Sequence, residues 1–221
     1  MKKTKLSQPL SNKPNLWDLL VKRSLEDTAN FVEKNLESAI YRPSRELFYS
    51  SVVNSMQKNN GLVCEFGVYN GRSINLLSRM LPNSIFFGFD SFIGLPEKWS
   101  GNDLDKGYFN RSGIPPVTNE NVELRIGSFA DTIPNFINEI SKETQIDLLH
   151  IDCDIYSSTK TILDLCHSNI QSGTLIVFDE YFGYPNWRNH EHKAFTEFLS
   201  QFGYKHEYLF YRTRQLCVQI K

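Results

Sequence analysis

The chain has 221 residues, of which 40% are hydrophobic and 22% are charged, and Lys+Arg 24 against Asp+Glu 25 give a net charge of -1. This composition is typical of a folded globular protein that is long enough for one sizeable core, and it excludes a disordered chain. Proteins that bind nucleic acid or an anionic membrane surface usually carry a basic excess, so we expect neither kind of partner.

The cysteines and the N-terminus indicate the compartment. Cys64, Cys153, Cys166 and Cys217 form no C-x-x-C pair, and buried, reduced thiols are typical of cytosolic proteins. The N-terminus lacks the continuous apolar segment of a signal peptide, and no apolar run approaches the roughly 20 residues that span a bilayer. We therefore expect a soluble, cytoplasmic protein.

The N-terminal part of the chain predicts a tail followed by helices. Residues 1–14 are polar and basic, which predicts a flexible tail. From Leu16 onward apolar residues recur at helical spacing as far as Ile40, Pro43 breaks the run, and a second helix is predicted over 44–58. Residues 15–60 are thus expected to form a helical cover. A lid, a contact in a homo-oligomer, or both are compatible with this segment.

The rest of the chain, residues 61–221, alternates between strands and helices and is expected to form one domain. Seven apolar runs are interpreted as its strands: 62–66, 84–89, 122–126, 146–151, 173–178, 206–211 and 215–220. Strands that alternate with helices favour right-handed crossovers and a parallel sheet. The last two runs are joined by a short turn, so they must pair antiparallel. The predicted fold class is α/β, a doubly wound, mostly parallel, seven-stranded Rossmann-like sheet with a C-terminal antiparallel hairpin.

A glycine loop follows the first strand of this domain. It has the pattern E-x-G-x-x-x-G, with Glu65, Gly67 and Gly71 as the fixed positions, and it leads into a helix. Glycine lets the backbone turn tightly and approach a ligand, and a helix start offers free N–H groups. The spacing differs from the G-x-G-x-x-G of pyrophosphate loops. It suits S-adenosylmethionine, whose cationic groups Glu65 could meet directly or through water, although an ordinary strand–helix turn would look similar.

Polar residues after the next two strands favour an adenosine-containing cofactor. Asp90 ends a strand 23 residues after Gly67, a placement suited to a carboxylate that accepts ribose hydroxyls. Ser128 and Phe129 follow the third strand, where they could meet the adenine, although each of these residues could instead cap a helix or turn. The predicted cofactor-binding residues are Glu65, Gly67, Tyr69, Gly71, Ser73, Asp90, Ser91, Ser128, Phe129 and Asp152.

Acidic residues end the fourth and fifth strands of the domain. Asp152 and Asp154 follow one strand, and Asp179 and Glu180 follow the other. Ligands of open α/β sheets bind beyond the carboxyl ends of the strands, so we expect these side chains to converge. Crowded carboxylates repel one another unless a cation lies among them, which favours Mg²⁺ held by Asp152, Asp179 and Glu180. Helix capping or pairing with Arg or Lys is the alternative.

These motifs together resemble the macrocin O-methyltransferase (TylF-like) family. The similarity extends from about Gly61 to the C-terminus and is most specific in L-H-I-D-x-D-x-Y-x-S-T and V-F-D-E-Y. It implies the class I methyltransferase sheet, S-adenosylmethionine as the cofactor, Mg²⁺, and methylation of a hydroxyl on a sugar or a glycosylated small molecule. By this resemblance the cofactor is held by Glu65, Gly67, Gly71 and Asp90, and the metal by Asp152, Asp179 and Glu180.

The chain departs from the family at Glu180, where the metal-dependent members usually carry aspartate. Glutamate can ligate a metal, but its longer stem shifts the ligand atom. The following segment, residues 181–192, could wall an acceptor site or form an ordinary surface loop. Its aromatic and basic residues are Tyr184, Trp187, Arg188, His190 and His192.

The expected reaction is attack of an acceptor oxygen on the sulfonium methyl group. Asp152 is the predicted metal ligand or base, Asp154 is its alternate, and His190 is the base if no metal binds. Two other functions fit parts of the sequence. One is a metal-dependent glycosyltransferase that uses Asp152-Cys153-Asp154 as its D-x-D motif, and the other is a cofactor-binding module without turnover. An NAD-linked oxidoreductase ranks last because of the glycine spacing.

Overall fold

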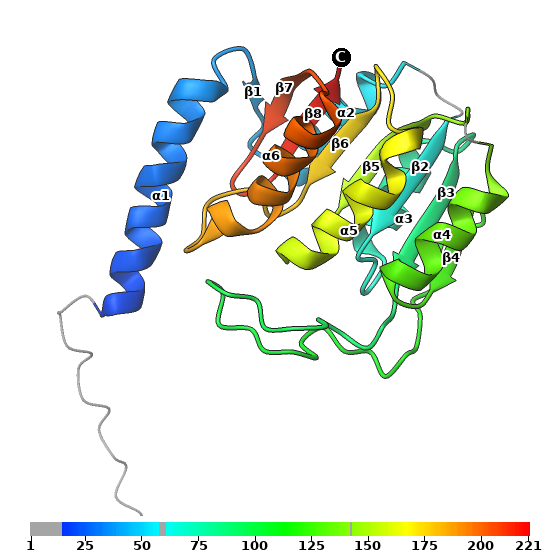
Figure 1. Ribbon diagram of the computed structural model, residues 1–221, viewed down its shortest axis with the longest axis horizontal. Coiled ribbons are helices and arrows are strands. Elements are labelled where there is room, and N and C mark those ends of the chain that lie inside the picture. Colours follow the sequence, from blue (N-terminus) through cyan, green and yellow to red (C-terminus); the bar gives the residue numbers. More distant parts are fainter. Residues whose placement is uncertain (1–14, 58–60, 142) are drawn as a thin grey trace, which may run out of the picture.

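The computed structural model describes residues 15–57, 61–141 and 143–221 as an eight-stranded sheet between two layers of helices (Figure 1). The tail expected over residues 1–14 lies outside the described residues. No helix in the described ranges is both long and apolar enough to cross a membrane.

The bounds of the elements are as follows. The strands are β1 (Ile40–Tyr41), β2 (Leu62–Phe66), β3 (Ile85–Asp90), β4 (Val122–Ile126), β5 (Ile146–Ile151), β6 (Leu175–Phe178), β7 (His206–Tyr211) and β8 (Leu216–Ile220). The α-helices are α1 (Leu16–Asn35), α2 (Arg45–Asn54), α3 (Arg72–Met80), α4 (Phe129–Glu139), α5 (Tyr156–Cys166) and α6 (Glu191–Phe202). Two single-turn 3-10 helices, His167–Asn169 and Trp187–Asn189, complete them.

The strand order is β1-β7-β8-β6-β5-β2-β3-β4, and β8 alone runs antiparallel to its neighbours β6 and β7. All seven predicted strands are present, so the expected doubly wound sheet with a terminal hairpin is confirmed. From β2 the chain winds outward through β3 and β4, whereas β5 and β6 lie on the other side of β2. This reversal creates a crevice at the carboxyl ends of β2 and β5.

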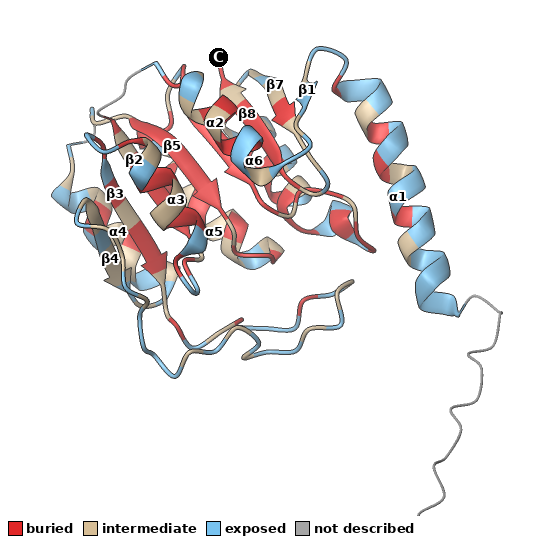
Figure 2. Ribbon diagram, turned by 180° about the vertical axis from the view of Figure 1, so that it is seen from behind, coloured by how far each residue is buried: buried red, intermediate tan, exposed pale blue. Residues whose placement is uncertain are grey.

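Burial of the sheet on both faces explains the apolar character of its strands. Every residue of β5 is buried, as expected for a central parallel strand covered on both sides. Helices α4, α5 and α6 cover one face, with a core that includes Phe136 and Phe195, and α2 and α3 cover the other, with a core that includes Phe48 and Leu77 (Figures 1 and 2). The buried residues coloured in Figure 2 follow these strands.

The N-terminal segment differs from the prediction at its end. The helical pattern was expected to reach Ile40, but α1 ends at Asn35, and Ile40–Tyr41 form the edge strand β1 beside Phe210 and Tyr211. Pairing with β7 satisfies the backbone of this short segment, and it overrides the local periodicity. Helix α1 lies at the same edge, where only one stripe of its surface is buried (Figure 2).

A long connection between β3 and β4, residues 91–121 and hereafter the strap, has neither α-helix nor named strand. Its backbone folds on itself, because Leu95 N–H donates to Tyr108 O at 2.9 Å and Trp99 N–H donates to Leu104 O at 2.8 Å. The strap is rich in glycine and proline, which favours turns over regular elements. It extends past the carboxyl ends of the strands (Figure 1).

Candidate active site

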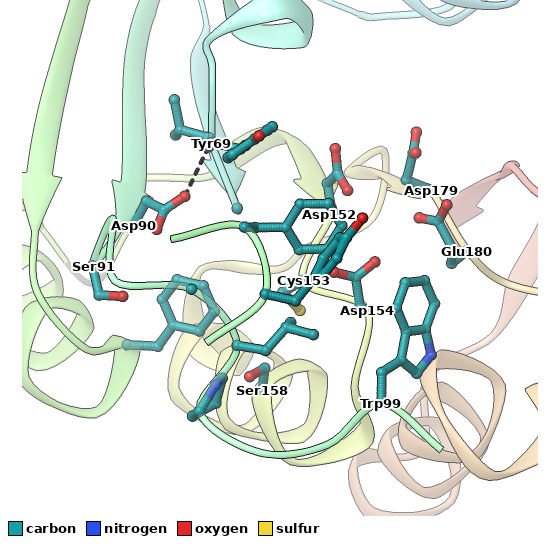
Figure 3. A pocket seen from close by; sticks show the side chains of 18 of the residues that line it. Tyr69, Asp90, Ser91, Trp99, Asp152, Cys153, Asp154, Ser158, Asp179 and Glu180 are labelled. Carbon is teal, nitrogen blue, oxygen red and sulfur yellow. Dashed lines mark hydrogen bonds between the residues drawn. The ribbon is translucent and has the colours of Figure 1, made fainter. Parts of the chain in front are cut away.

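The described residues enclose a cavity of about 1030 Å³ at the carboxyl ends of β2–β6. Its walls are formed by the connections that follow these strands, and the strap is one of them. Figure 3 shows Asp90 at one end of the cavity and Asp154 and Glu180 at the other. The cavity thus lies at the topological reversal where a doubly wound sheet binds its ligand.

Asp90 is held in place at the first end of the cavity. Its Oδ2 accepts a hydrogen bond from the Tyr69 backbone N–H at 2.8 Å, and its Oδ1 accepts one from the Phe92 N–H at 2.8 Å (Figure 3). Each oxygen retains a lone pair for a further donor. Ser128 and Phe129 line the same cavity, so the Asp90 end can accept the ribose hydroxyls and the base of an adenosine.

The glycine loop brings the backbone close to the cavity at Gly67. This residue has φ +95°, and a Cβ placed there would lie 1.7 Å from the Asp152 carbonyl oxygen. Only glycine fits such an approach. Gly71 also has positive φ, at +76°, where it precedes α3 as its N-cap. Glycine at 67 thus allows the loop to pack on the chain that follows β5, while its backbone lines the cavity.

Most of the predicted cofactor residues line the cavity. Those on its wall are Gly67, Tyr69, Ser73, Asp90, Ser91, Ser128, Phe129 and Asp152. Glu65 and Gly71 are not among the lining residues. Gly71 shapes the turn, and Glu65 is only 1% exposed, so a direct contact between Glu65 and a ligand in the cavity is not available in this structure.

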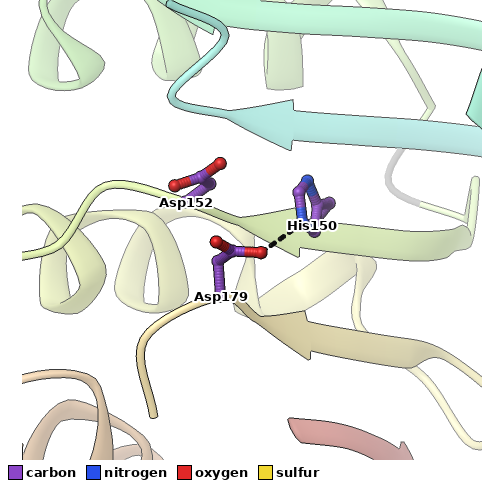
Figure 4. Close-up of side chains that lie close together, drawn as sticks. All are labelled: His150, Asp152 and Asp179. Carbon is purple, nitrogen blue, oxygen red and sulfur yellow. Dashed lines mark ion pairs between the residues drawn. The ribbon is translucent and has the colours of Figure 1, made fainter. Parts of the chain in front are cut away.

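Glu65 instead belongs to a buried polar network that the sequence reasoning missed. Its Oε1 accepts from Ser73 Oγ at 2.9 Å, and its Oε2 lies 2.9 Å from His150 Nδ1. The other ring nitrogen of His150 lies 3.0 Å from the Tyr49 hydroxyl and 3.7 Å from Asp179 Oδ1 (Figure 4). The network therefore connects the glycine loop with the acids after β6.

The charge of His150 follows from these neighbours. Burial alone would lower its pKa, but Glu65 and Asp179 raise the pKa of His150 to about 10. The imidazolium, Gln215 and Arg45 in turn hold the pKa of the Asp179 carboxyl below its usual range, against the effect of burial. A histidine in β5, in register with the acid Glu65 of the neighbouring strand β2, was the sequence signal that could have indicated this pair.

The acids converge at the second end of the cavity, as the strand positions predicted. Asp152, Asp154, Asp179 and Glu180 all line it (Figure 3). Burial and the charge of Asp179 raise the pKa of both Asp152 and Glu180 well above the ordinary range. Glu180 Oε2 is buried without a hydrogen-bond partner among the described residues. This end of the cavity therefore has an excess of acceptor oxygens.

Asp154 has a strained backbone conformation. Its φ is +68°, and Ile155 N–H donates to Cys153 O at 2.8 Å across it. Such a three-residue turn with positive φ is rare and strained for a residue other than glycine, and strain of this kind clusters at functional sites. Burial and Asp179 raise the pKa of Asp154 to about 7, although Arg214 acts in the opposite direction.

The donor set fits a divalent cation. Carboxylate oxygens of Asp152, Asp154 and Glu180 lie within 4.8 Å of one another, and Asp152 and Asp179 form a second such group with His150. A cation would pair with the partnerless Glu180 oxygen and offset the crowding of acids that raises these pKa values. Oxygen ligands of this kind suit Mg²⁺. Asp154 joins the set in addition to the predicted ligands.

Two arginines beside the acids were not predicted. Arg45, from the start of α2, lies 4.0 Å from Asp179, and Arg214, from the β7–β8 turn, lies against the Tyr184 ring at 5.4 Å. Both line the cavity. They come from elements that are distant from the acids in the sequence, so no local motif could have indicated them.

For residues 181–192 an acceptor wall and a surface loop were both open interpretations. None of the residues named there lines the cavity. Arg188 forms a bidentate ion pair with Asp27 of α1 at 2.8 and 2.9 Å, while Trp187 is buried. His190 Nε2 hydrogen bonds to the Ser100 carbonyl at 2.7 Å. The segment joins α1 and the strap to the body of the protein, and His190 is not among the residues that line the cavity.

Comparison with known proteins relates this cavity to a reaction class. A family model described as a methyltransferase domain matches residues 64–181, which is more than half of the chain. No curated protein matches the sequence.

Several solved structures are similar to the whole chain. The calicheamicin methyltransferase CalS11 matches at 19% identity over 99% of each chain, with a TM-score of 0.65. Its apo structure, described as a TDP-rhamnose 3'-O-methyltransferase, matches at 18% identity over 94% and 96% of the two chains, with a TM-score of 0.57. The O-methyltransferase NovP matches at 19% identity over 92% of this chain and 97% of its own, with a TM-score of 0.55. At these identities the likeness shows the fold.

Proposed function

This chain belongs to the methyltransferase domain family and is an S-adenosylmethionine-dependent methyltransferase, and on that premise we propose that it is an O-methyltransferase of the TylF-like type. Its acceptor is a hydroxyl group of a sugar or a glycosylated small molecule, and a divalent metal assists the reaction. The proposal rests on one observation, a single cavity with different groups at its two ends. At one end the Asp90 carboxylate is held by two backbone N–H groups, and at the other several buried acids lie close together.

The cofactor end fits the bound form of S-adenosylmethionine. Asp90 would accept the ribose hydroxyls, Phe129 and Ser128 would lie by the adenine, and Gly67 would admit the amino-acid portion. Glu65 acts through Ser73 and His150, as a positioning residue. The acids line the same cavity as these residues, so the cofactor and the acceptor would share it.

The acid end fits activation of an alcohol, which is a poor nucleophile at neutral pH. Asp152, Asp179 and Glu180 would hold Mg²⁺, with Asp154 beside them. A bound divalent cation lowers the pKa of a hydroxyl that it contacts and orients it. The similarity to CalS11, a TDP-rhamnose 3'-O-methyltransferase, supports a sugar hydroxyl as the acceptor.

The reaction forms one bond from the acceptor oxygen to the methyl carbon and breaks the bond from that carbon to sulfur. The sulfonium becomes the neutral thioether of S-adenosylhomocysteine, and the hydroxyl proton passes to a carboxylate. We assign that proton to Asp154, because its carboxylate lines the cavity among the acids and follows a strained backbone turn. Asp152 orients the acceptor or the metal. Holding both reactants in one cavity supplies much of the remaining rate.

The test is a methyl-transfer assay with purified protein, S-adenosylmethionine and Mg²⁺ against methyl glycosides, sugar nucleotides and catechol, with methylated products identified by mass spectrometry. Methylation of a sugar hydroxyl supports the proposal. Exclusive methylation of catechol, or of an amine, would overturn the acceptor class. Binding of the cofactor product without turnover on any member of the panel would favour the non-catalytic alternative. Family membership leaves the glycosyltransferase and oxidoreductase alternatives without support.

A further inference from the structure

Among the described residues, four basic side chains belong to the cavity lining, and they come from different places in the fold. Arg214 lies over the Tyr184 ring at the acid end, and Lys106 is an exposed residue of the strap. Arg45 and Arg72 are the first residues of α2 and α3. These two helices contact each other and cover the same face of the sheet (Figure 2). The two arginines therefore approach the cavity from one side.

Arg72 directly follows the glycine turn. It lines the cavity and is exposed, and its backbone N–H donates to Asn70 Oδ1 at 3.3 Å. Its guanidinium forms no hydrogen bond or ion pair with another described residue. A charged group in this position, next to the loop that would admit the amino-acid portion of the cofactor, is free to pair with an anion.

Arg45 lies beside the acids of the cavity, but none of them occupies its donors. Its side chain is 35% exposed, and its guanidinium lies 4.0 Å from Asp179 Oδ1 without a hydrogen bond to any described residue. Asp179 has other partners, because Oδ1 accepts a hydrogen bond from Gln215 and lies 3.7 Å from His150 Nε2. Asp152 also attracts Arg45. The guanidinium is thus available to an anionic group that lies next to Asp152.

The amino-acid portion of S-adenosylmethionine is a zwitterion, so it needs an acid and a base side by side. Asp152 lines the cavity, and its backbone carbonyl packs against Gly67 of the glycine turn, so its carboxylate is placed to accept from the ammonium. The carboxylate of the cofactor would be repelled by the neighbouring acids unless a cation lay close to it. A guanidinium matches a carboxylate best, because it offers two parallel N–H donors.

We propose that Arg45 and Arg72 bind the carboxylate of the cofactor, and that they select a cofactor with an intact amino-acid portion over its decarboxylated form. This inference rests on the proposed function and deepens it, since it assigns the groups that recognise one charge of the cofactor. It also explains how an anionic group binds beside the acids that line the same cavity.

The test compares two ligands that differ only in the carboxylate. One is S-adenosylhomocysteine, and the other is S-adenosyl-3-thiopropylamine, which keeps the adenosine, the thioether and the ammonium. Both are titrated calorimetrically into the full chain in buffer with EDTA, so that no metal contributes. The unchanged protein should bind S-adenosylhomocysteine roughly tenfold more tightly than the amine. Arg45→Gln and Arg72→Gln should each lower this ratio to about threefold or less.

The amine also reports whether each variant is folded. Its affinity should stay within about twofold in both glutamine variants, because the adenosine and the ammonium meet other groups. Arg79→Gln is the matched control, since Arg79 is an exposed arginine of the same helix α3 that lies outside the cavity lining. This control should keep the full tenfold ratio. Arg72→Lys should give an intermediate ratio, because the charge remains but the two parallel donors are lost.

Three results would overturn the assignment while leaving the Asp90 site intact. These are a ratio near one in the unchanged protein, a ratio that stays tenfold in both glutamine variants, and an equal loss of affinity for both ligands, which would indicate a purely structural role. Failure of the unchanged protein to bind either ligand would instead count against the cofactor site itself, and against this inference with it.

Discussion

At the Asp90 end of the cavity the carboxylate is satisfied by two backbone N–H groups, whereas at the Asp154 end several carboxylates face one another with few donors between them. The Asp90 end is already arranged to accept hydrogen bonds from the hydroxyls of a neutral ribose. The second end crowds buried carboxyl groups whose pKa values are raised, and a cation there would favour their ionised form. Binding of the cofactor and activation of the acceptor therefore depend on separate groups, which the Glu65–His150–Asp179 network connects through β2 and β5.

The largest expected effect concerns the base. Asp154→Asn should lower kcat by roughly 10²–10⁴-fold, because the amide cannot accept the hydroxyl proton. The affinity for S-adenosylhomocysteine, measured by calorimetry, should stay within about twofold, because the cofactor end is separate. Asp105→Asn, an exposed acid of the strap, is the control and should keep full turnover. Loss of cofactor affinity in the Asp154 variant would show that the two ends are not independent.

The second prediction concerns His150, the central residue of the Glu65–His150–Asp179 network. Replacing it by Gln removes a buried imidazolium and should lower the free energy of unfolding by roughly 3 kcal/mol near neutral pH. The folded-state pKa of about 10 exceeds the ordinary 6.5. The contribution of His150 is thus fully present below pH 6.5 and is lost as pH rises through 10.

Urea unfolding of the unchanged protein and the His150→Gln variant near pH 7 and near pH 10 measures this difference. The free energies of unfolding of the unchanged protein and the His150→Gln variant should differ less near pH 10 than near pH 7. His192→Gln provides the matched control, because burial lowers the pKa of His192 to about 4 and this ring is neutral at both pH values. A gap for His150→Gln that is independent of pH would argue that the ring is neutral and acts only through packing.

The dependence of turnover on pH tests whether Asp154 is the base. Asp154 must be unprotonated to act as base, and its pKa lies at about 7. The value of kcat should therefore rise about tenfold per pH unit below the pKa of Asp154 and level off above it, and a bound divalent cation should move the inflection to lower pH. The rise should disappear in Asp154→Asn. A profile with the same inflection in the variant would assign the titration to another group.

The smallest expected effect is that of the metal on stability. A Mg²⁺ concentration about tenfold above its Kd should stabilise the protein by roughly 1.4 kcal/mol and raise Tm by a few degrees. Glu180→Gln should abolish this shift, whereas Glu180→Asp should retain part of it, because a carboxylate remains. An equal shift in Glu180→Gln would indicate that Mg²⁺ binds elsewhere.

The sequence was informative where a function depends on residues close together in the chain. The seven strands, the glycine turn at Gly67 and the acids that follow β5 and β6 could all be predicted from local patterns and from the rule that strand ends converge. Strand β1 could not, because its two residues are extended only through pairing with β7.

The parts that escaped prediction depend on long-range packing. His150 pairs with Glu65 across neighbouring strands, and Arg45 reaches Asp179 from α2. Trp99 lies near the acids only because the strap, which has no regular elements, is hydrogen bonded to His190 through Ser100. Local periodicity carries no information on such contacts, since each depends on where the whole chain brings its loops.

The central claim is that the Asp90 end of this cavity binds the cofactor of a methyltransferase. We would titrate S-adenosylhomocysteine into the purified protein by calorimetry, with Mg²⁺ and with EDTA, alongside the Asp90→Ala variant. Binding in both buffers that is lost in the variant is the expected result, since ribose recognition depends on Asp90 and not on the metal. Absence of binding to the unchanged protein in either buffer, or equal binding to Asp90→Ala, would show that the cofactor site has been assigned wrongly.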